Sequence, residues 1–375
     1  LDLYFYIDDQ GKFYNKTWDF SGNNAVETLL DKVRYLSYGE TSDRFYFRLG
    51  NMPSFTLGYG ILVSNYSNTI QYPDVRRLGL DMRTNSGSLS TQFVHSDLKR
   101  LDRAGLVAFR AELPLTPRLK VGVFFALDPD LTKGLIDSDD DGYPDDFDHF
   151  PDDGDSYSVA QNIYLSNQSQ WDNVCEDWID QNDQGGDLEY GINHCMDLGY
   201  GQNVNYFDSE NTLKKQTVSG AGIDLSIVLT KKLTLYSQFA QLVLDREKND
   251  GASVSDLEFG EYSASLGWGA IPVGLGLSLG SEMFSLSTNI EYRLNDRHFM
   301  FSFWDQAYEV NRAVVLSGTE ISTKAESLIN YGKMQGVFFG SSLSMFKLMT
   351  LDIAYQKMMG ETWLNDGSTP SDFIS

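Results

Sequence analysis

The residues best suited to chemistry in this sequence are carboxylates that lie in one short stretch. Counted from the first, they occupy positions 1, 3, 5, 9 and 12, the ligand spacing of a calcium loop, which also needs a glycine at position 6. These residues are Asp137, Asp139, Asp141, Asp145 and Asp148, with Gly142 at the glycine position. Tyr143 is placed to offer its backbone carbonyl. We therefore expect these five aspartates and Tyr143 to bind one Ca²⁺. The alternative is an acidic loop that is only solvated.

The same stretch, followed by Pro151 and Asp155, resembles the thrombospondin type-3 repeat, D-x-D-x-D-G-x-x-D-x-x-D-x-x-P, which is found in many bacterial surface proteins. The resemblance covers 137–155, about one repeat. Phe150 stands where that repeat has a cysteine. The resemblance therefore implies calcium binding but no disulfide-linked array of repeats.

Two cysteines, Cys175 and Cys195, lie in the same acidic region. Two thiols in one loop of an extracytoplasmic protein are typical of a disulfide, so we predict that they are joined. The alternative is a pair of free thiols in a cytosolic protein.

The negative charge of the chain is concentrated in this region. The formal net charge is −24, and residues 131–200 hold 18 Asp or Glu against one basic residue, Lys133. Such a surface repels nucleic acid and attracts cations, so nucleic acid is excluded as a partner.

The elements that must carry this acidic region are strands. No run approaches the eighteen or so apolar residues of a membrane-spanning helix. Instead, apolar residues alternate with glycine, serine and isolated charges along many segments, for example at 107–113, 119–127, 220–230, 286–292, 337–345 and 351–355. Alternation of this kind predicts an all-β, transmembrane antiparallel β-barrel whose apolar face meets lipid and whose second face lines the lumen.

Connection lengths support the same fold, because outer-membrane barrels alternate short periplasmic turns with longer external loops. We predict short turns near 85–87, 115–118, 230–232, 270–272, 295–297 and 346–347. Longer connections are expected at 98–104, 130–217, 245–258, 281–284 and 311–333. This order places 130–217 outside a Gram-negative cell, as a calcium-binding, disulfide-containing insertion, and it keeps 295–297 on the periplasmic side.

Further strands are expected at 44–49, 54–63 and 299–303, with one more at 1–8, which gives a single domain over 1–375 of about 14 to 16 strands. Helical spacing of apolar residues from Ala25 to Leu36 predicts a short helix within 10–43, either a plug in the lumen or a surface helix. The tail at 359–375 is expected to leave on the external side without a return strand, so that the barrel in this sequence is incomplete.

Charged residues on the predicted inner face are candidates for a lining of the pore that sorts solutes by charge, or for pairs that neutralise one another. They are Arg48, Asp81, Arg83, Arg110, Glu112, Asp224, Glu291 and Asp352. Aromatic residues near strand ends are candidates for interfacial girdles, namely Trp268, Tyr292, Trp304 and Tyr355.

A second resemblance is carried by Arg48–Gly50, Leu57–Leu62, Asn65–Asn68, Tyr72–Pro73 and Leu78–Asp81. These segments resemble outer-membrane barrels of porin-like type from Bacteroidota-like bacteria, which implies location and fold but no substrate. Two functions stay open: a channel or transporter for small solutes, or a non-conducting scaffold that uses the calcium loop to bind partner subunits or further copies of itself. No nucleophile, base and orienting group stand together near the four histidines, so we do not expect an enzyme.

Overall fold

The computed structural model describes residues 6–7, 13–14, 34–73, 75–101, 104–137, 144–145, 215–246, 263–280, 283–317, 320–328, 331–346, 348–361 and 371–374. Among these residues, thirteen strands form one antiparallel sheet in the order β17-β16-β15-β12-β11-β10-β9-β8-β7-β6-β5-β4-β3. Two small hairpins, β1-β2 and β13-β14, stand apart from it. The expected all-β antiparallel fold is confirmed.

The sheet strands are β3 Tyr35–Tyr38, β4 Phe45–Gly50, β5 Gly79–Asn85, β6 Ser90–His95, β7 Val107–Pro114, β8 Leu119–Asp128, β9 Gln216–Thr230, β10 Leu233–Arg246, β11 Ser263–Gly280, β12 Phe284–Asn295, β15 Met334–Met345, β16 Met349–Gly360 and β17 Ser371–Ile374. The hairpins are β1 Tyr6–Ile7 with β2 Phe13–Tyr14, and β13 Ala313–Ser317 with β14 Glu320–Thr323. Three short helices are η2 Leu131–Gly134, α7 Tyr308–Asn311 and α8 Lys324–Ser327. None of the described helices has the length and apolar character needed to span a membrane.

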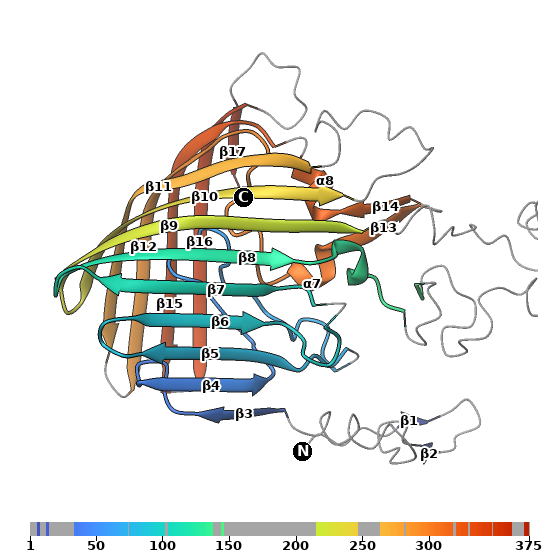
Figure 1. Cartoon of the computed structure of the whole chain (residues 1–375), viewed down its shortest axis with the longest axis horizontal. Helices are drawn as coiled ribbons and strands as arrows, with labels where there is room; N and C mark the ends of the chain where they lie inside the picture. Colours follow the sequence, from blue (N-terminus) through green and yellow to red (C-terminus); the bar gives the residue numbers. More distant parts are fainter. Residues whose placement is uncertain are drawn as a thin grey trace, which may run out of the picture.

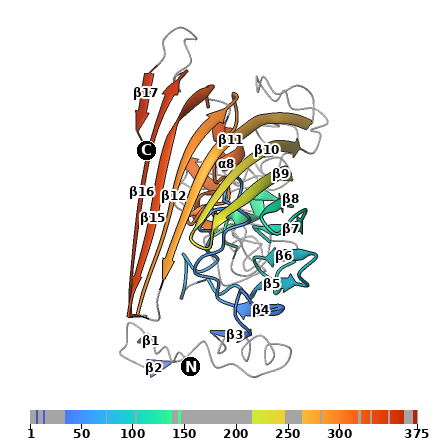
Figure 2. The ribbon, with the colours of Figure 1, turned by 90° about the vertical axis from the view of Figure 1, so that its left-hand side faces the viewer.

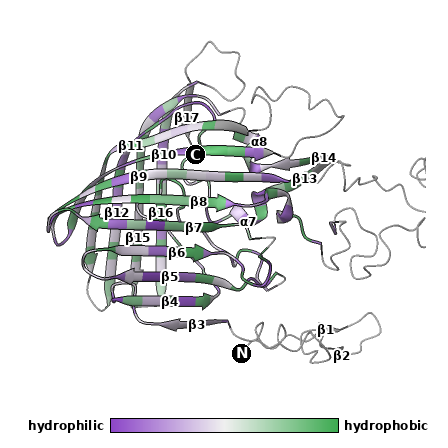
Figure 3. Ribbon diagram, in the orientation of Figure 1, coloured by the Kyte–Doolittle hydropathy of each residue, from purple (hydrophilic) through white to green (hydrophobic). Residues whose placement is uncertain are grey.

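The sheet curls, so that β12, β15 and β16 pass behind β5 to β10 in Figure 1, and the turned view in Figure 2 shows the two walls facing each other. Each strand presents one face outward and one inward. On β9, Ile223, Leu225 and Ile227 are 57%, 42% and 37% exposed, whereas the alternating Asp224 and Ser226 are buried. Figure 3 shows hydrophobic and hydrophilic residues mixed along individual strands such as β7. The outer face is therefore apolar, and the inward-facing positions of β9 include the polar Asp224 and Ser226, as the alternation predicts.

Connection lengths sort the two ends of the sheet. The connections at 39–44, 86–89, 115–118, 231–232, 281–283 and 346–348 are short and share one end, which we call the short-turn end. The connections at 51–78, 96–106, 129–215, 247–262 and 296–333 share the opposite, long-loop end. The predicted alternation of short and long connections is therefore present.

The predicted short turns at 270–272 and 295–297 were wrong. Because there are two such errors, the strands after 297 still run in the predicted directions. β11 runs through 270–272 and pairs with β10 and β12 on either side of an irregularity between Ala270 and Val273. Pro272 lies at this irregularity, where a strand tolerates a residue without an N–H group. The segment 281–284 therefore belongs to a short turn. Residues 296–298 begin a long connection at the same end of the sheet as 129–215, so the predicted contrast in exposure between 130–217 and 295–297 does not hold.

Several strand predictions need correction. Residues 54–63 and 299–303 are not sheet strands but parts of connections that pack against the inner face of the sheet. β1, at 6–7, pairs with β2 alone. Leu36, the last residue of the predicted helix, lies in strand β3, which is an exposed edge of the sheet. The tail does return, because β17 pairs with residues 357–360 of β16.

Candidate functional site: a plug inside the curled sheet

Two long connections turn inward and fill the long-loop end of the space enclosed by the sheet. We call the described residues of 51–78 and 298–312 the plug. Their backbones bond to one another: Ser302 N donates to Ile61 O at 2.9 Å, Trp304 N to Leu62 O at 3.0 Å, and Ser64 N to Trp304 O at 3.1 Å. These bonds join two segments that lie about 240 positions apart in the chain. The two connections therefore form one body.

The plug packs apolar side chains against the inner face. Phe55, Leu62, Phe303 and Trp304 are 0–1% exposed. They belong to one cluster with inward-facing wall residues of several strands, including Val94, Ala108, Phe124, Ala126, Val218, Ala240 and Leu242. Interiors packed in this way hold almost no water. Trp304 was predicted in an interfacial girdle; it lies instead in the centre of the plug core, because 299–304 folds inward rather than along the wall.

The tip of the plug touches the wall through polar and aromatic groups. Gly58 N donates to Gln92 Oε1 at 3.3 Å, and Ile61 N donates to Gln238 Oε1 at 3.2 Å. Gly58 has a φ of +59°, and a Cβ there would lie 3.0 Å from Arg110 Nε, so glycine allows the tip to approach the wall closely. The ring of Tyr59 stacks on that of Tyr236 with centroids 4.2 Å apart.

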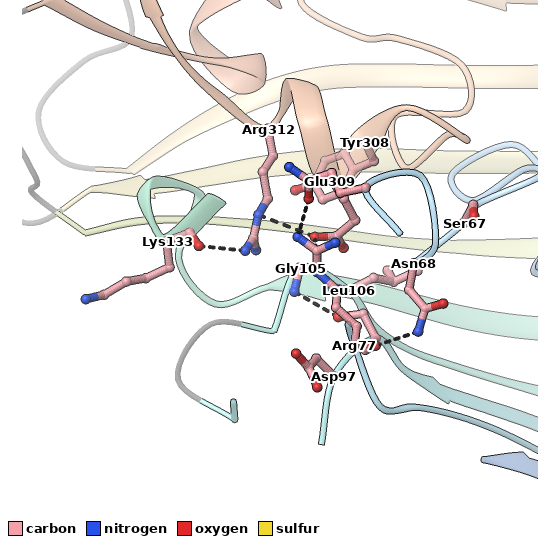
Figure 4. A network of polar contacts seen from close by, with 12 residues as sticks. Ser67, Asn68, Arg77, Asp97, Gly105, Leu106, Lys133, Tyr308, Glu309 and Arg312 are labelled. Atoms are coloured by element: carbon pink, nitrogen blue, oxygen red, sulfur yellow. Dashed lines mark hydrogen bonds and ion pairs between the residues drawn. The ribbon is translucent and has the colours of Figure 1, made fainter. Parts of the chain in front are cut away.

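A buried polar cluster joins the plug to the base of the long acidic insertion. We call it the joint cluster; its members are Tyr66, Arg77, Asp128, Tyr308, Glu309 and Arg312, drawn in part in Figure 4. Arg312 Nη1 lies 3.2 Å from Asp128 Oδ2 at the end of β8, and its Nη2 donates to Lys133 O of η2 at 2.8 Å. Tyr308 donates to Asp128 at 2.7 Å. Arg77 lies 3.3 Å from Glu309, which also accepts from the hydroxyl of Tyr66.

Burial and the neighbouring carboxylates set the charge states in this cluster. Burial raises the pKa of Tyr308, and the negative charge of Asp128 raises it further. Burial and the negative charge of Glu309 likewise raise the pKa of Tyr66. Both phenols therefore stay neutral donors. Burial opposes the charge of Arg312, but the attraction of Asp128 and Glu309 outweighs it and raises the pKa. Two arginines and two carboxylates thus balance one another in a site that excludes water.

The structure places three of the eight predicted pore-lining residues, Arg110, Glu112 and Asp224, in a second network, which lies on the wall. Arg110 holds Asp224 with two bonds of 2.8 Å and Glu112 with one of 2.6 Å. Lys120 Nζ lies 2.8 Å from Glu112. This group bridges β7, β8 and β9, is mostly buried, and lies directly beneath the plug tip at Gly58.

The remaining predicted lining residues lie elsewhere on the inner face. Arg83 donates to Asp81 at 2.8 and 3.0 Å, and Arg48 Nε donates to Asn51 O at 2.7 Å. Glu291 accepts from Tyr236 at 2.6 Å and pairs with Arg293 at 2.7 Å. Asp352 joins no such group; it is exposed and aligned with Ser342 on β15, close to the short-turn end.

Sequence reasoning missed the residues that hold the plug. Arg293, whose guanidinium lies 4.9 Å from the centroid of the Phe301 ring in the plug, could have been found, because it lies two positions after Glu291 and therefore on the same face of the strand. Glu309 and Arg312 lie in a connection without alternation, and nothing in their neighbourhood in the sequence indicates that Asp128 is their partner.

The predicted calcium and disulfide residues fall largely outside the described residues. Asp139, Asp141, Tyr143, Asp148, Cys175 and Cys195 all lie there. Asp137 is described and 9% exposed, and Asp145 N donates to Ile136 O at 2.8 Å. Within the described residues, no three His, Cys, Asp or Glu side chains are grouped as a metal site.

Comparison with known proteins finds similar solved structures, including these two. One is the outer-membrane expressed OmpT of Vibrio cholerae, 10% identical, with 88% of this chain and 72% of that chain covered and a TM-score of 0.32. The other is the ferric-catecholate import receptor Fiu from E. coli K12 in its open form, 9% identical, with 91% and 49% covered and a TM-score of 0.19. No protein-family model and no curated protein matches the chain.

The class of the protein follows from its own strands. A single curled antiparallel sheet, apolar and exposed outside, polar inside, with short turns at one end and long connections at the other, is the architecture of an outer-membrane β-barrel. Its distinguishing feature is a plug built from two of its own connections.

Proposed function

We propose that the protein is a gated transporter of small solutes in the outer membrane of a Gram-negative bacterium, closed in the conformation described here. Placement in a membrane is supported by the outer face, where large apolar side chains are exposed on strand after strand, among them Phe109, Val123, Ile223, Ile290 and Ile353. A soluble protein does not leave so continuous an apolar surface in water. By the usual orientation of such barrels, the long-loop end faces the cell exterior.

The observation that carries the proposal is the division of the lumen into a wet and a dry half. Towards the short-turn end, inward-facing residues are small or polar and exposed, including Ser285, Ser287, Thr350, Asp352 and Ala354. Towards the long-loop end, the plug and its apolar cluster fill the same enclosure. A solute entering from the short-turn end would therefore meet the plug, and passage requires that the plug move.

The contacts between plug and wall suit such a movement. The tip is held by Gln92, Gln238 and the guanidinium of Arg110, and the base by the joint cluster. Charged pairs in a dry site contribute little net stability compared with apolar packing, because their desolvation offsets their attraction. Water that enters as the plug leaves would solvate these groups again, which lowers the cost of opening.

Liposome swelling tests this proposal. The parent protein in liposomes should admit sugars slowly, and Trp304→Ala should admit them faster, because removing a buried Trp costs about 3–5 kcal/mol of plug packing. The matched control is Val337→Ala, which removes a lipid-facing side chain that is 50% exposed. Heat-modifiable mobility shows whether Trp304→Ala is folded. If the folded variant admits sugars no faster than the parent, the proposal of a gated transporter is wrong.

A second candidate function is a non-conducting scaffold, and the dryness of the plug core favours it. In that case the barrel anchors the acidic insertion at the cell surface, where it would bind partner subunits or further copies of the chain. Both Trp304→Ala and the parent would then be impermeable, and capture of a partner would be lost when 138–200 is deleted.

Under either function we propose that the insertion binds Ca²⁺ through Asp137, Asp139, Asp141, Tyr143, Asp145 and Asp148 and is closed by a Cys175–Cys195 disulfide. Support comes from the ligand spacing and from the location of the insertion, which leaves β8 and returns to β9 at the long-loop end. Free-thiol titration of the unreduced, denatured protein should find no thiol.

A further inference from the structure

Two neighbouring turns at the short-turn end expose an apolar surface. We call it the turn patch; it consists of Met283, Phe284, Phe346, Leu348 and Met349, which are 65%, 41%, 65%, 90% and 54% exposed. The two turns touch, because Phe346 N donates to Met283 O at 2.7 Å. In register, Phe284 lies opposite Met345, and Met345 lies opposite Met349. The patch is therefore one continuous surface across β12, β15 and β16.

This composition is not shared by every connection at the short-turn end, although the connection at 115–118 also exposes an apolar residue, Leu115, at 61%. The connection at 39–44 has the sequence Gly-Glu-Thr-Ser-Asp-Arg, and the connection at 231–232 is Lys-Lys. Both are exposed and polar, as turns in water should be. Apolar side chains exposed at the level of the turn patch therefore need a separate cause.

Along β16 the turn patch continues the apolar outer face without a polar break. Phe284 on β12 and Met349 on β16 point to the outer side of their strands. Along β16, Met349 is followed on the same side by Leu351, Ile353 and Tyr355, which are 51%, 54% and 48% exposed. We infer that the turn patch is covered by bilayer lipid: the turns at 283–284 and 346–349 lie inside the membrane interface, whereas those at 39–44 and 231–232 lie in water.

The occupant is lipid rather than protein because of this continuity with the lipid-facing belt. The five residues of the patch are all apolar; the charged residues of the two connections, Glu282 and Lys347, lie outside the described residues. Exposed Leu, Phe and Met side chains insert readily at the acyl boundary of a bilayer. The consequence is a barrel in which the two turns that carry the patch lie deeper in the bilayer than the connections at 39–44 and 231–232. This inference does not depend on transport.

Spin labels test the inference directly. In a background with Cys175→Ser and Cys195→Ser, Leu348→Cys and the matched control Lys232→Cys are labelled with a nitroxide in liposomes. Oxygen, which partitions into lipid, should broaden the signal of the label at 348 more than a water-soluble nickel chelate does, and the order should reverse at 232. A second label at Met283→Cys should behave as at 348.

Two outcomes overturn the inference. If the chelate reaches the label at 348 as readily as that at 232, the turn patch lies in water. If neither reagent reaches it, a protein covers the patch, and spin–spin broadening between labels would identify a second copy. Heat-modifiable mobility of each labelled protein establishes that the barrel is folded.

Discussion

Replacing Arg312 by Met should release the plug while leaving the wall intact. The guanidinium lies 3.2 Å from Asp128 and 3.7 Å from Glu309, and all three side chains are at most 2% exposed. Removing one partner of a buried ion pair leaves an uncompensated charge and typically costs about 3–5 kcal/mol. The loss also removes the bond from Arg312 to Lys133 O.

The cost falls on the closed state, because opening lets water reach Asp128 and Glu309. A change of about 3–5 kcal/mol corresponds to an opening equilibrium shifted by roughly two to four orders of magnitude. Native-state hydrogen exchange measures this shift at amides bonded within the plug, such as Tyr66 N to Phe55 O and Trp304 N to Leu62 O. Amides of the ladder between β9 and β10 serve as the internal control.

A charge-balanced variant separates this cause from simple loss of packing. Arg312→Met combined with Asp128→Asn removes one positive and one negative charge and leaves Glu309 paired with Arg77. Replacing both members of a buried ion pair is often neutral, so this double variant should recover most of the protection. The reasoning is refuted if Arg312→Met leaves exchange at Trp304 unchanged, or if the double variant is less protected than the single one.

Three further predictions concern the wall and the insertion. Arg110→Met should lower the free energy of unfolding by about 3–5 kcal/mol in urea because it leaves Asp224 buried and unpaired, whereas Arg297→Met, at the exposed pair with Glu361, should cost at most about 1 kcal/mol; equal losses would contradict this ranking. Gly222→Ala should cost about 1–3 kcal/mol by the same measurement, since its Cβ would clash with the backbone oxygen of Phe239 and the ring of Phe124, and Gly276→Ala, whose nearest neighbour is at 3.7 Å, should be close to neutral. Calorimetry should find one Ca²⁺ site that the Asp139→Ala, Asp141→Ala double variant lacks, and undiminished binding would place the site elsewhere.

The strands and their inner and outer faces could be predicted from the sequence because alternation is a local signal. On β9 the exposed Ile223 and buried Asp224 follow directly from it. The same signal misled at Phe299, Phe301 and Phe303. These residues alternate like a strand, but the first and last bury themselves in the plug core. Alternation shows that one side of a segment is apolar and does not show which surface covers that side.

The plug could not be located because its contacts join distant segments. A short helix, either a plug or a surface helix, was expected within 10–43, where residues 35–38 form an edge strand and residues 15–33 lie outside the described residues. The observed plug depends on pairs such as Ile61 with Ser302 and Asp128 with Arg312, which no local pattern connects. The predicted charges lie on the inner face. Pairs two positions apart on one strand, such as Asp81 with Arg83, follow from the alternation, whereas pairs between strands, such as Arg110 with Asp224, do not.

The ion current through single molecules of the parent protein in a planar bilayer tests the central claim most directly. A barrel closed by a plug of its own connections should show no steady open level and, at most, brief openings that lengthen in Arg312→Met. A stable current of porin size in the parent would show that the lumen is open and that the plug does not close it.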